Sequence, residues 1–124
     1  MPALPNQQQI NMAAGSQWSQ SYQLQNDDGT LMDISGFTFE MVIRPSTSDH
    51  TQPALVAVNS TASSAQGYIT VTVDTATLLV VLSPTATALL GQGSNPYALW
   101  MDPGDSDATA LVVGTCFSQL IAAA

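Results

Sequence analysis

The residues that could carry out chemistry are few and lie far apart in the chain. His50 is the only histidine and follows Asp49 in a polar segment, so the two side chains could form a general acid–base pair. The only cysteine, Cys116, lies in an apolar segment without a basic neighbour that would lower its pKa. No nucleophile or oxyanion-hole motif accompanies either residue. We therefore interpret His50 as an exposed loop residue and Cys116 as a buried, inert thiol, and we predict no catalytic residue and no enzymatic activity.

Three aspartates follow one another closely near the C-terminus: Asp102, Asp105 and Asp107. Calcium prefers several carboxylate and carbonyl oxygens, which makes these residues the candidate calcium ligands of the chain. Their spacing differs from that of an EF-hand loop, and the glutamate that binds calcium with both oxygens is missing. Asp, Pro and Gly are also typical of a hairpin turn, so we favour a solvated turn without metal. One histidine and one cysteine are too few for a zinc site, and we predict no cofactor.

Aromatic residues suggest a glycan-binding surface as an alternative function. Those considered are Trp18, Tyr22, Phe37, Tyr97 and Trp100. Trp18, Tyr22 and Phe37 share strand parity with apolar neighbours, so core packing explains these three better. Trp100 has the opposite parity to the apolar residues around it. On a strand with one buried face it points outward, where a large aromatic side chain marks an interface.

The charge composition excludes two classes of partner. Nine acidic residues face one base, Arg44, and charged residues make up 8% of the 124 residues, so the formal net charge is -8. Binding to nucleic acid or to an anionic membrane surface requires several lysines or arginines, and we predict neither partner. The chain has no lysine. Lysine protects the exposed edge strands of soluble monomers, so its absence indicates edges that neighbouring protein chains cover.

The dominant pattern along the chain is alternation of apolar and polar residues, typical of strands with one buried face. The alternating segments are residues 17–25, 37–44, 54–59, 68–74, 97–101 and 108–117. Residues 77–82 are apolar at both parities, so we expect that strand to be covered on both faces. Short strands separated by turns predict an all-β, antiparallel immunoglobulin-like β-sandwich of 7–8 strands. The predicted core residues are Trp18, Leu24, Phe39, Ile43, Val71 and Leu99.

One segment has the pattern of a short helix. Ser83 suits the N-cap, Pro84 suits the first helical position, and Gly91 suits the C-terminal stop. These residues predict a single short helix that ends at Leu90, with Leu89 and Leu90 as its core anchors.

The chain is predicted to form a single domain over residues 1–124, with short N- and C-terminal arms. Residues 1–11 contain neither the positive charge nor the apolar run of a secretory signal. The longest aliphatic run, residues 78–82, is far too short for a membrane-spanning helix.

Several short motifs follow one another in a characteristic order. They are an early strand with Trp18 and Tyr22, the turn Asp28-Gly29, the turn Met32-Asp33-Ile34-Ser35-Gly36-Phe37, a strand ending at Ile43-Arg44, the strand start Gly67-x-Ile69, the turn and helix Leu82-Ser83-Pro84-x-x-Thr87-x-x-Leu90, and the strands Tyr97-Ala98-Leu99-Trp100 and Ala110-Leu111-Val112-Val113-Gly114. In this order the chain resembles the small β-sandwich modules of tailed-phage virions, including the N-terminal domain of upper baseplate proteins. The resemblance extends over roughly residues 8–118. It implies a structural role in a phage particle and no chemical activity.

Taken together, these observations predict a non-enzymatic bacteriophage virion protein, a tail, baseplate or fibre-attachment component that acts through protein–protein contacts. The alternatives are a capsid (head) decoration protein and, in another class, a glycan-binding module for host recognition. The predicted partners are other virion proteins and copies of the chain itself, in a homo-oligomer or a many-copy assembly. The predicted location is the virion, assembled in the host cytoplasm without a signal peptide. We expect Trp100, Leu120 and Ile121, and residues 1–9 in extended form, to contact neighbouring chains.

Overall fold

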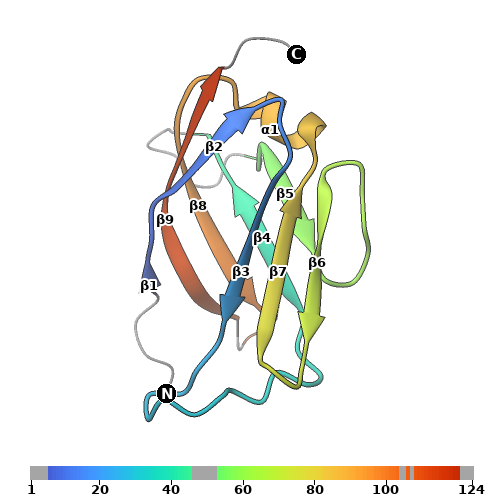
Figure 1. The fold of residues 1–124 in the computed structure, drawn as a ribbon, viewed down its shortest axis with the longest axis vertical. Helices are drawn as coiled ribbons and strands as arrows, with labels where there is room; N and C mark the ends of the chain where they lie inside the picture. The colour runs from blue at the N-terminus through green and yellow to red at the C-terminus, as the bar shows by residue number, and fades with distance from the viewer. Residues whose placement is uncertain (1–5, 46–52, 104–105, 107, 121–124) are drawn as a thin grey trace.

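The computed structural model describes residues 6–45, 53–103, 106 and 108–120, and these fold into two β-sheets that enclose one core (Figure 1). The larger sheet has the strand order β1-β9-β8-β4-β5, with β2 also paired to β9, and the smaller sheet has the order β3-β7-β6. The predicted all-β sandwich is confirmed. The elements are β1 (Asn6–Gln7), β2 (Ile10–Ala14), β3 (Trp18–Gln23), β4 (Phe39–Ile43), β5 (Val56–Asn59), β6 (Gly67–Thr72), β7 (Thr77–Leu82), α1 (Pro84–Leu90), β8 (Gly93–Met101) and β9 (Thr109–Leu120).

The strand order follows that of a variable-type immunoglobulin domain, but the described strands include neither a C″ strand nor an A strand on the smaller sheet. In that nomenclature β3, β7 and β6 take the B, E and D positions, and β5, β4, β8 and β9 take the C′, C, F and G positions. The pairs β3–β7, β6–β7, β4–β5, β4–β8 and β8–β9 are antiparallel, as predicted.

The first strand departs from the predicted antiparallel plan. β1 and β2 both run parallel to β9, and their register continues without a shift, since Gln7 pairs with Val113 and Ile10 pairs with Cys116. Counted as one interrupted strand, β1 and β2 bring the total to eight. From Asn6 onward the predicted extended arm is therefore an edge strand of the larger sheet, and its contact with a neighbouring chain stays a prediction. A free edge on β9, distant in sequence, provides the hydrogen-bonding partner.

The interruption between β1 and β2 has a local cause. The Tyr97 hydroxyl, on β8, donates a hydrogen bond to the Gln8 carbonyl, on the far side of β9. Gly114 of β9 lies directly between them, paired with Tyr97, and a Cβ there would collide with the Gln8 carbonyl. Because Gly114 has no side chain, the Tyr97 hydroxyl of β8 can pass β9 and bond to Gln8, between β1 and β2.

The chain passes from the larger to the smaller sheet between β2 and β3, and a buried threonine of α1 fixes this crossover. Thr87 is 0% exposed. Its Oγ1 accepts a hydrogen bond from the Gly15 N–H at 3.0 Å and donates to the Ser16 carbonyl at 2.8 Å. Gly15 has a φ of +85°, which a residue with a Cβ rarely adopts.

The predicted helix forms between the predicted caps. The Ser83 hydroxyl accepts a hydrogen bond from the Ala86 N–H at 3.2 Å, and Gly91 ends the helix with a φ of +57°. Leu90 is buried, as expected, but the prediction for Leu89 is wrong, because its side chain is 53% exposed. At 3.6 residues per turn, Leu89 lies about 100° from the centre of the buried face. In the part of the chain that the structure describes, no helix has the length and apolar character needed to cross a membrane.

The core lies between the sheets and contains most of the residues predicted for it. Leu24, Phe39, Ile43 and Leu99 are buried. Trp18 and Val71 are only partly buried, on β3 and β6. Both strands are edges of the smaller sheet, so one side of each residue has no neighbouring strand.

The strand that was expected to be covered on both faces is β7, the central strand of the smaller sheet. Its inward residues Leu78, Val80 and Leu82 are fully buried. On the outward face Val81 is also buried, between β3 and β6, but Leu79 is only half-buried. On its outward face β7 is therefore covered at Val81, near its C-terminal end, but only partly at Leu79.

The turn from Met32 to Phe37, which contributes to the phage resemblance, is held by its own side chains. The Asp33 carboxylate accepts hydrogen bonds from the Ser35 hydroxyl at 2.7 Å and the Ser35 N–H at 3.1 Å, and these bonds lower the pKa of Asp33. Ile34 is buried in the core, and Gly36 has a φ of +81°. The motif thus ties a tight turn to the sandwich.

Candidate interface on the outer face of the larger sheet

The predicted catalytic candidates do not meet in one site. His50 and Asp49 lie outside the described residues. Cys116 is fully buried, in agreement with the prediction, and burial raises the pKa of its thiol to about 11. A thiol with this pKa remains protonated at neutral pH and is a poor nucleophile. No group of three or more His, Cys, Asp or Glu residues forms a metal-binding cluster among the described residues.

The first of the three calcium candidates has a structural role. The Asp102 carboxylate accepts a hydrogen bond from the Thr38 N–H at 2.9 Å, and the Asp102 N–H donates to the Thr38 carbonyl at 2.7 Å. These bonds join the end of β8 to the start of β4. Asp105 and Asp107 lie outside the described residues.

Two phenols and the thiol form a buried polar group inside the sandwich. Burial raises the pKa of Tyr22 and, to a smaller extent, the pKa of Tyr97. The Tyr22 hydroxyl is buried without a hydrogen-bond partner among the described residues, although the Tyr97 hydroxyl is near enough to perturb its pKa. Tyr97 is used to hold Gln8. Tyr97 is thus the member of this group that contacts the N-terminal strand, and all three residues are buried.

The aromatic residues considered for a glycan surface are divided between core and surface. Tyr22 and Tyr97 are buried, and Trp18 packs partly against the core. Phe37 was expected to pack in the core, but it precedes β4 and is 37% exposed. The turn at Gly36 ends the strand pattern before Phe37, so parity no longer determines its direction.

Trp100 lies on the outer face of the larger sheet. It pairs with Glu40 of β4, whereas the inward neighbour Leu99 pairs with Met41 in the core. A shallow hollow of about 240 Å³ lies beside Trp100. We name its lining the Trp100 patch, which consists of Val42, Arg44, Pro45, Pro96, Tyr97, Ala98 and Trp100.

The Trp100 patch is mostly apolar and belongs to two central strands. Val42 is only 8% exposed although it lies on the outer face, and Trp100 is half-buried. Ala98 pairs with Val42 on one side and with Val113 on the other, so small and apolar side chains extend across three strands. Such a face is typical of the core of a protein–protein interface.

The edge strands carry no charge. β1, β2, β3, β5 and β6 form the sheet edges among the described strands, and none of them contains Asp, Glu, Lys, Arg or Pro. Soluble monomers usually protect such edges with charges or proline. These strands are therefore open to pairing with another chain.

The predicted interface residues of the C-terminal tail are only partly described. Leu120 is the last residue of β9 and is 61% exposed. Ile121 lies outside the described residues.

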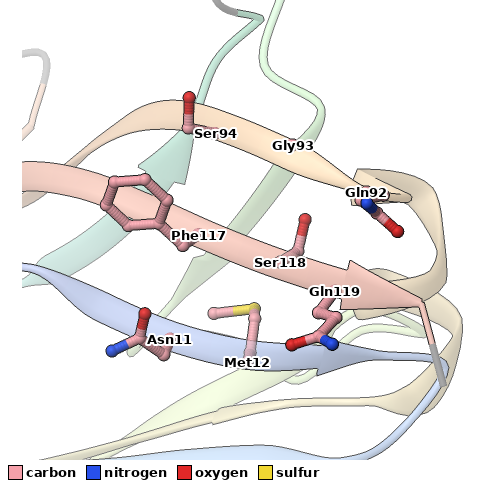
Figure 2. Close-up of a pocket in the computed structure, with 8 residues that line it drawn as sticks. All are labelled: Asn11, Met12, Gln92, Gly93, Ser94, Phe117, Ser118 and Gln119. Atoms are coloured by element: carbon pink, nitrogen blue, oxygen red, sulfur yellow. The ribbon is translucent and has the colours of Figure 1, made fainter.

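A second and larger hollow was not anticipated from the sequence. Its volume is about 470 Å³, and it lies at the far end of the same sheet (Figure 2). Phe117 is its aromatic residue and is 41% exposed. Its parity, opposite to that of buried Cys116, is the signal that could have identified an outward position. The lining residues are Asn11, Met12, Gln92, Gly93, Ser94, Phe117, Ser118 and Gln119.

The sequence matches no protein-family model and no curated protein. The chemistry of the two surfaces therefore carries the functional interpretation.

Proposed function

We propose that the chain is a non-enzymatic structural component of a bacteriophage virion, acting in the tail or baseplate through contacts with copies of itself and with other virion proteins. The order of the sequence motifs supports the phage assignment. The observation that carries the assembly role is the Trp100 patch, an apolar surface on the central strands of the larger sheet. Trp100 and Ala98 are partly exposed there beside Val42, and apolar side chains exposed together on one face mark interaction sites.

The charges around the patch suit a second copy of the same chain. Glu40, Val42 and Arg44 alternate along β4 with the inward residues Met41 and Ile43, so they share the outer face. A two-fold axis near Val42 brings Glu40 of one copy opposite Arg44 of the other, and the reverse. Arg44 already has an interaction within its own chain, and the arrangement adds an acid of the second copy to its surroundings.

The uncharged strand edges support contacts with further chains. A copy docked through the Trp100 patch leaves the edges β3 and β6 of the smaller sheet available. Edge strands bind other chains by main-chain hydrogen bonds, which need no specific side chains. A many-copy particle requires at least two such surfaces on each subunit.

The test of self-assembly is sedimentation velocity of the purified chain over a range of concentrations. Wild type is expected to associate, and Trp100→Ala to raise the dissociation constant at least about 30-fold, because loss of a central aromatic costs about 2 kcal/mol or more. Leu89→Ala is the control, since Leu89 is a 53% exposed apolar residue on α1, outside the Trp100 patch and the sheet edges. Glu40→Arg is expected to weaken association, and adding Arg44→Glu to restore it.

The test of the virion role is mass spectrometry of purified particles of the phage that encodes the chain, followed by its location in an electron-microscopy map. Detection at the tail or baseplate supports the proposal. Density at the capsid overturns the tail position in favour of head decoration. A chain that is absent from particles and monomeric at every concentration overturns the structural role itself.

A further inference from the structure

The larger hollow is formed by three adjacent strands: β8 and β9, which are consecutive in the chain, and β2, which is distant from them in sequence. Figure 2 shows β9 between β2 and β8, with Phe117 near one end of the group and Gln92 near the other. Phe117 pairs with Asn11 on one side and with Ser94 on the other, so these three side chains share one face. Gln119 follows two residues later on the same face.

The lining offers hydrogen-bonding groups that the protein itself does not use. Asn11, Gln92, Ser94 and Gln119 are all exposed. Within the described part of the chain, no hydrogen bond engages the side chains of Gln92, Ser94 or Gln119, and Asn11 only accepts one from Gln9 at 3.2 Å. Each amide presents both a donor and an acceptor, and each hydroxyl can act as either.

The charge of the hollow restricts its ligand. None of the eight lining residues is acidic or basic. An anionic ligand finds no cation there and is repelled by the net charge of -8. A cationic ligand finds no carboxylate in the hollow to bind. The lining therefore fits a neutral ligand with many hydroxyl or amide groups.

The size of the hollow and the exposed ring of Phe117 further define the ligand that would fit. The hollow of about 470 Å³ is a shallow depression, more open than the one beside Trp100, so a ligand bound there keeps one side exposed to solvent. A Cβ on Gly93 would meet no atom within 4 Å, so the space beside this residue is open. The exposed ring of Phe117 provides a flat apolar surface, and the C–H face of a pyranose ring packs against such surfaces. We propose that this hollow is a binding site for a neutral carbohydrate, with Phe117 as the stacking platform and Asn11, Gln92, Ser94 and Gln119 as hydrogen-bonding partners.

The site is separate from the Trp100 patch. The two sets of lining residues do not overlap, but Ser94 of the hollow and Pro96 of the patch are two positions apart on β8, about 7 Å along a strand. Trp100 itself is six positions from Ser94, about 20 Å, so substitutions at Trp100 and at Phe117 test the two surfaces separately. Carbohydrate binding therefore does not depend on the proposed virion role, and either proposal can fail alone.

The test begins with a glycan array of neutral and acidic oligosaccharides. A nuclear magnetic resonance titration of the ¹⁵N-labelled chain follows, with galactose, glucose and N-acetylglucosamine at millimolar concentration. The expected result is that at least one neutral sugar shifts the amide signals of residues 11–12, 92–94 and 117–119. Phe117→Ala is expected to weaken binding about tenfold, equivalent to about 1.4 kcal/mol. Gln119→Ala is expected to weaken it by about two- to tenfold.

Two exposed residues outside the hollow provide matched controls. Tyr68→Ala removes an aromatic side chain that is 40% exposed, close to the 41% of Phe117, and Gln17→Ala removes an exposed glutamine. Both should bind as wild type, and the dispersion of the amide signals shows that each variant is folded. Three results would overturn the proposal: no neutral sugar perturbs these amides, only acidic glycans bind, or folded Phe117→Ala binds as tightly as wild type.

Discussion

Replacing Thr87 by valine tests whether one buried hydroxyl fixes the passage of the chain between the two sheets. The side chains have nearly the same shape, so the fully buried site gains no cavity. The two residues also have similar helix propensities. The change removes the bond to the Gly15 N–H at 3.0 Å and the bond to the Ser16 carbonyl at 2.8 Å.

The expected loss of unfolding free energy follows from these two bonds. Each contributes about 0.5–1.5 kcal/mol net, and a buried group left without a partner costs about 1–3 kcal/mol. Gly15 is exposed and Ser16 is half-buried, so water can replace part of the lost bonding. We therefore expect a loss of about 1.5–3 kcal/mol, a large share of the 5–15 kcal/mol typical of a domain.

Urea unfolding followed by tryptophan fluorescence measures this loss. A change of about 2 kcal/mol lowers the midpoint by roughly 1 M urea for a domain of this size. Thr85→Val is the matched control, because Thr85 is exposed on the same helix. It should stay within about 0.5 kcal/mol of wild type. A Thr87→Val midpoint equal to that of Thr85→Val would refute the role of the hydroxyl.

Three further predictions concern the core, the first strand and the thiol. In urea unfolding, Phe39→Ala should lower the unfolding free energy by about 3–5 kcal/mol. Phe37→Ala, at a position that is 37% exposed, should lower it by less than about 1 kcal/mol. Equal losses for the two variants would contradict the burial pattern. Gly114→Ala should lower the unfolding free energy by about 1–3 kcal/mol, because the new Cβ collides with the Gln8 carbonyl. The displaced strand should also exchange the hydrogen of the Gln8 amide faster. An unchanged exchange rate would show that the strand is not displaced. Folding raises the pKa of the Cys116 thiol from 9.0 to about 11, so the stability that is present below pH 9 should fall as the pH rises toward 11. At pH 8 the thiol of the native protein should react only slowly with a disulfide reagent. Labelling of the native protein as fast as that of the urea-unfolded protein would rule out a buried thiol.

The sequence alone determined the local structure of this protein. Alternating residues predicted β4 and β6, because a strand with one buried face needs apolar side chains at every second position. A run that is apolar at both parities predicted β7. Ser83 and Gly91 predicted both ends of α1, because caps act on the backbone within a few residues. Cys116 was predicted as buried from its apolar neighbours alone.

The tertiary structure decided what is distant in sequence. The partner of the first strand is β9, more than a hundred positions away, and no local pattern specifies which edge a strand will join. Burial of Trp18 and Val71 depends on their places in edge strands, which parity does not reveal. The proposed carbohydrate site combines Asn11, Ser94 and Phe117, which are neighbours only because β9 lies between β2 and β8. Main-chain hydrogen bonds between strands can form between any two segments, so the pairing, and every site built across it, follows from the packing of the whole chain.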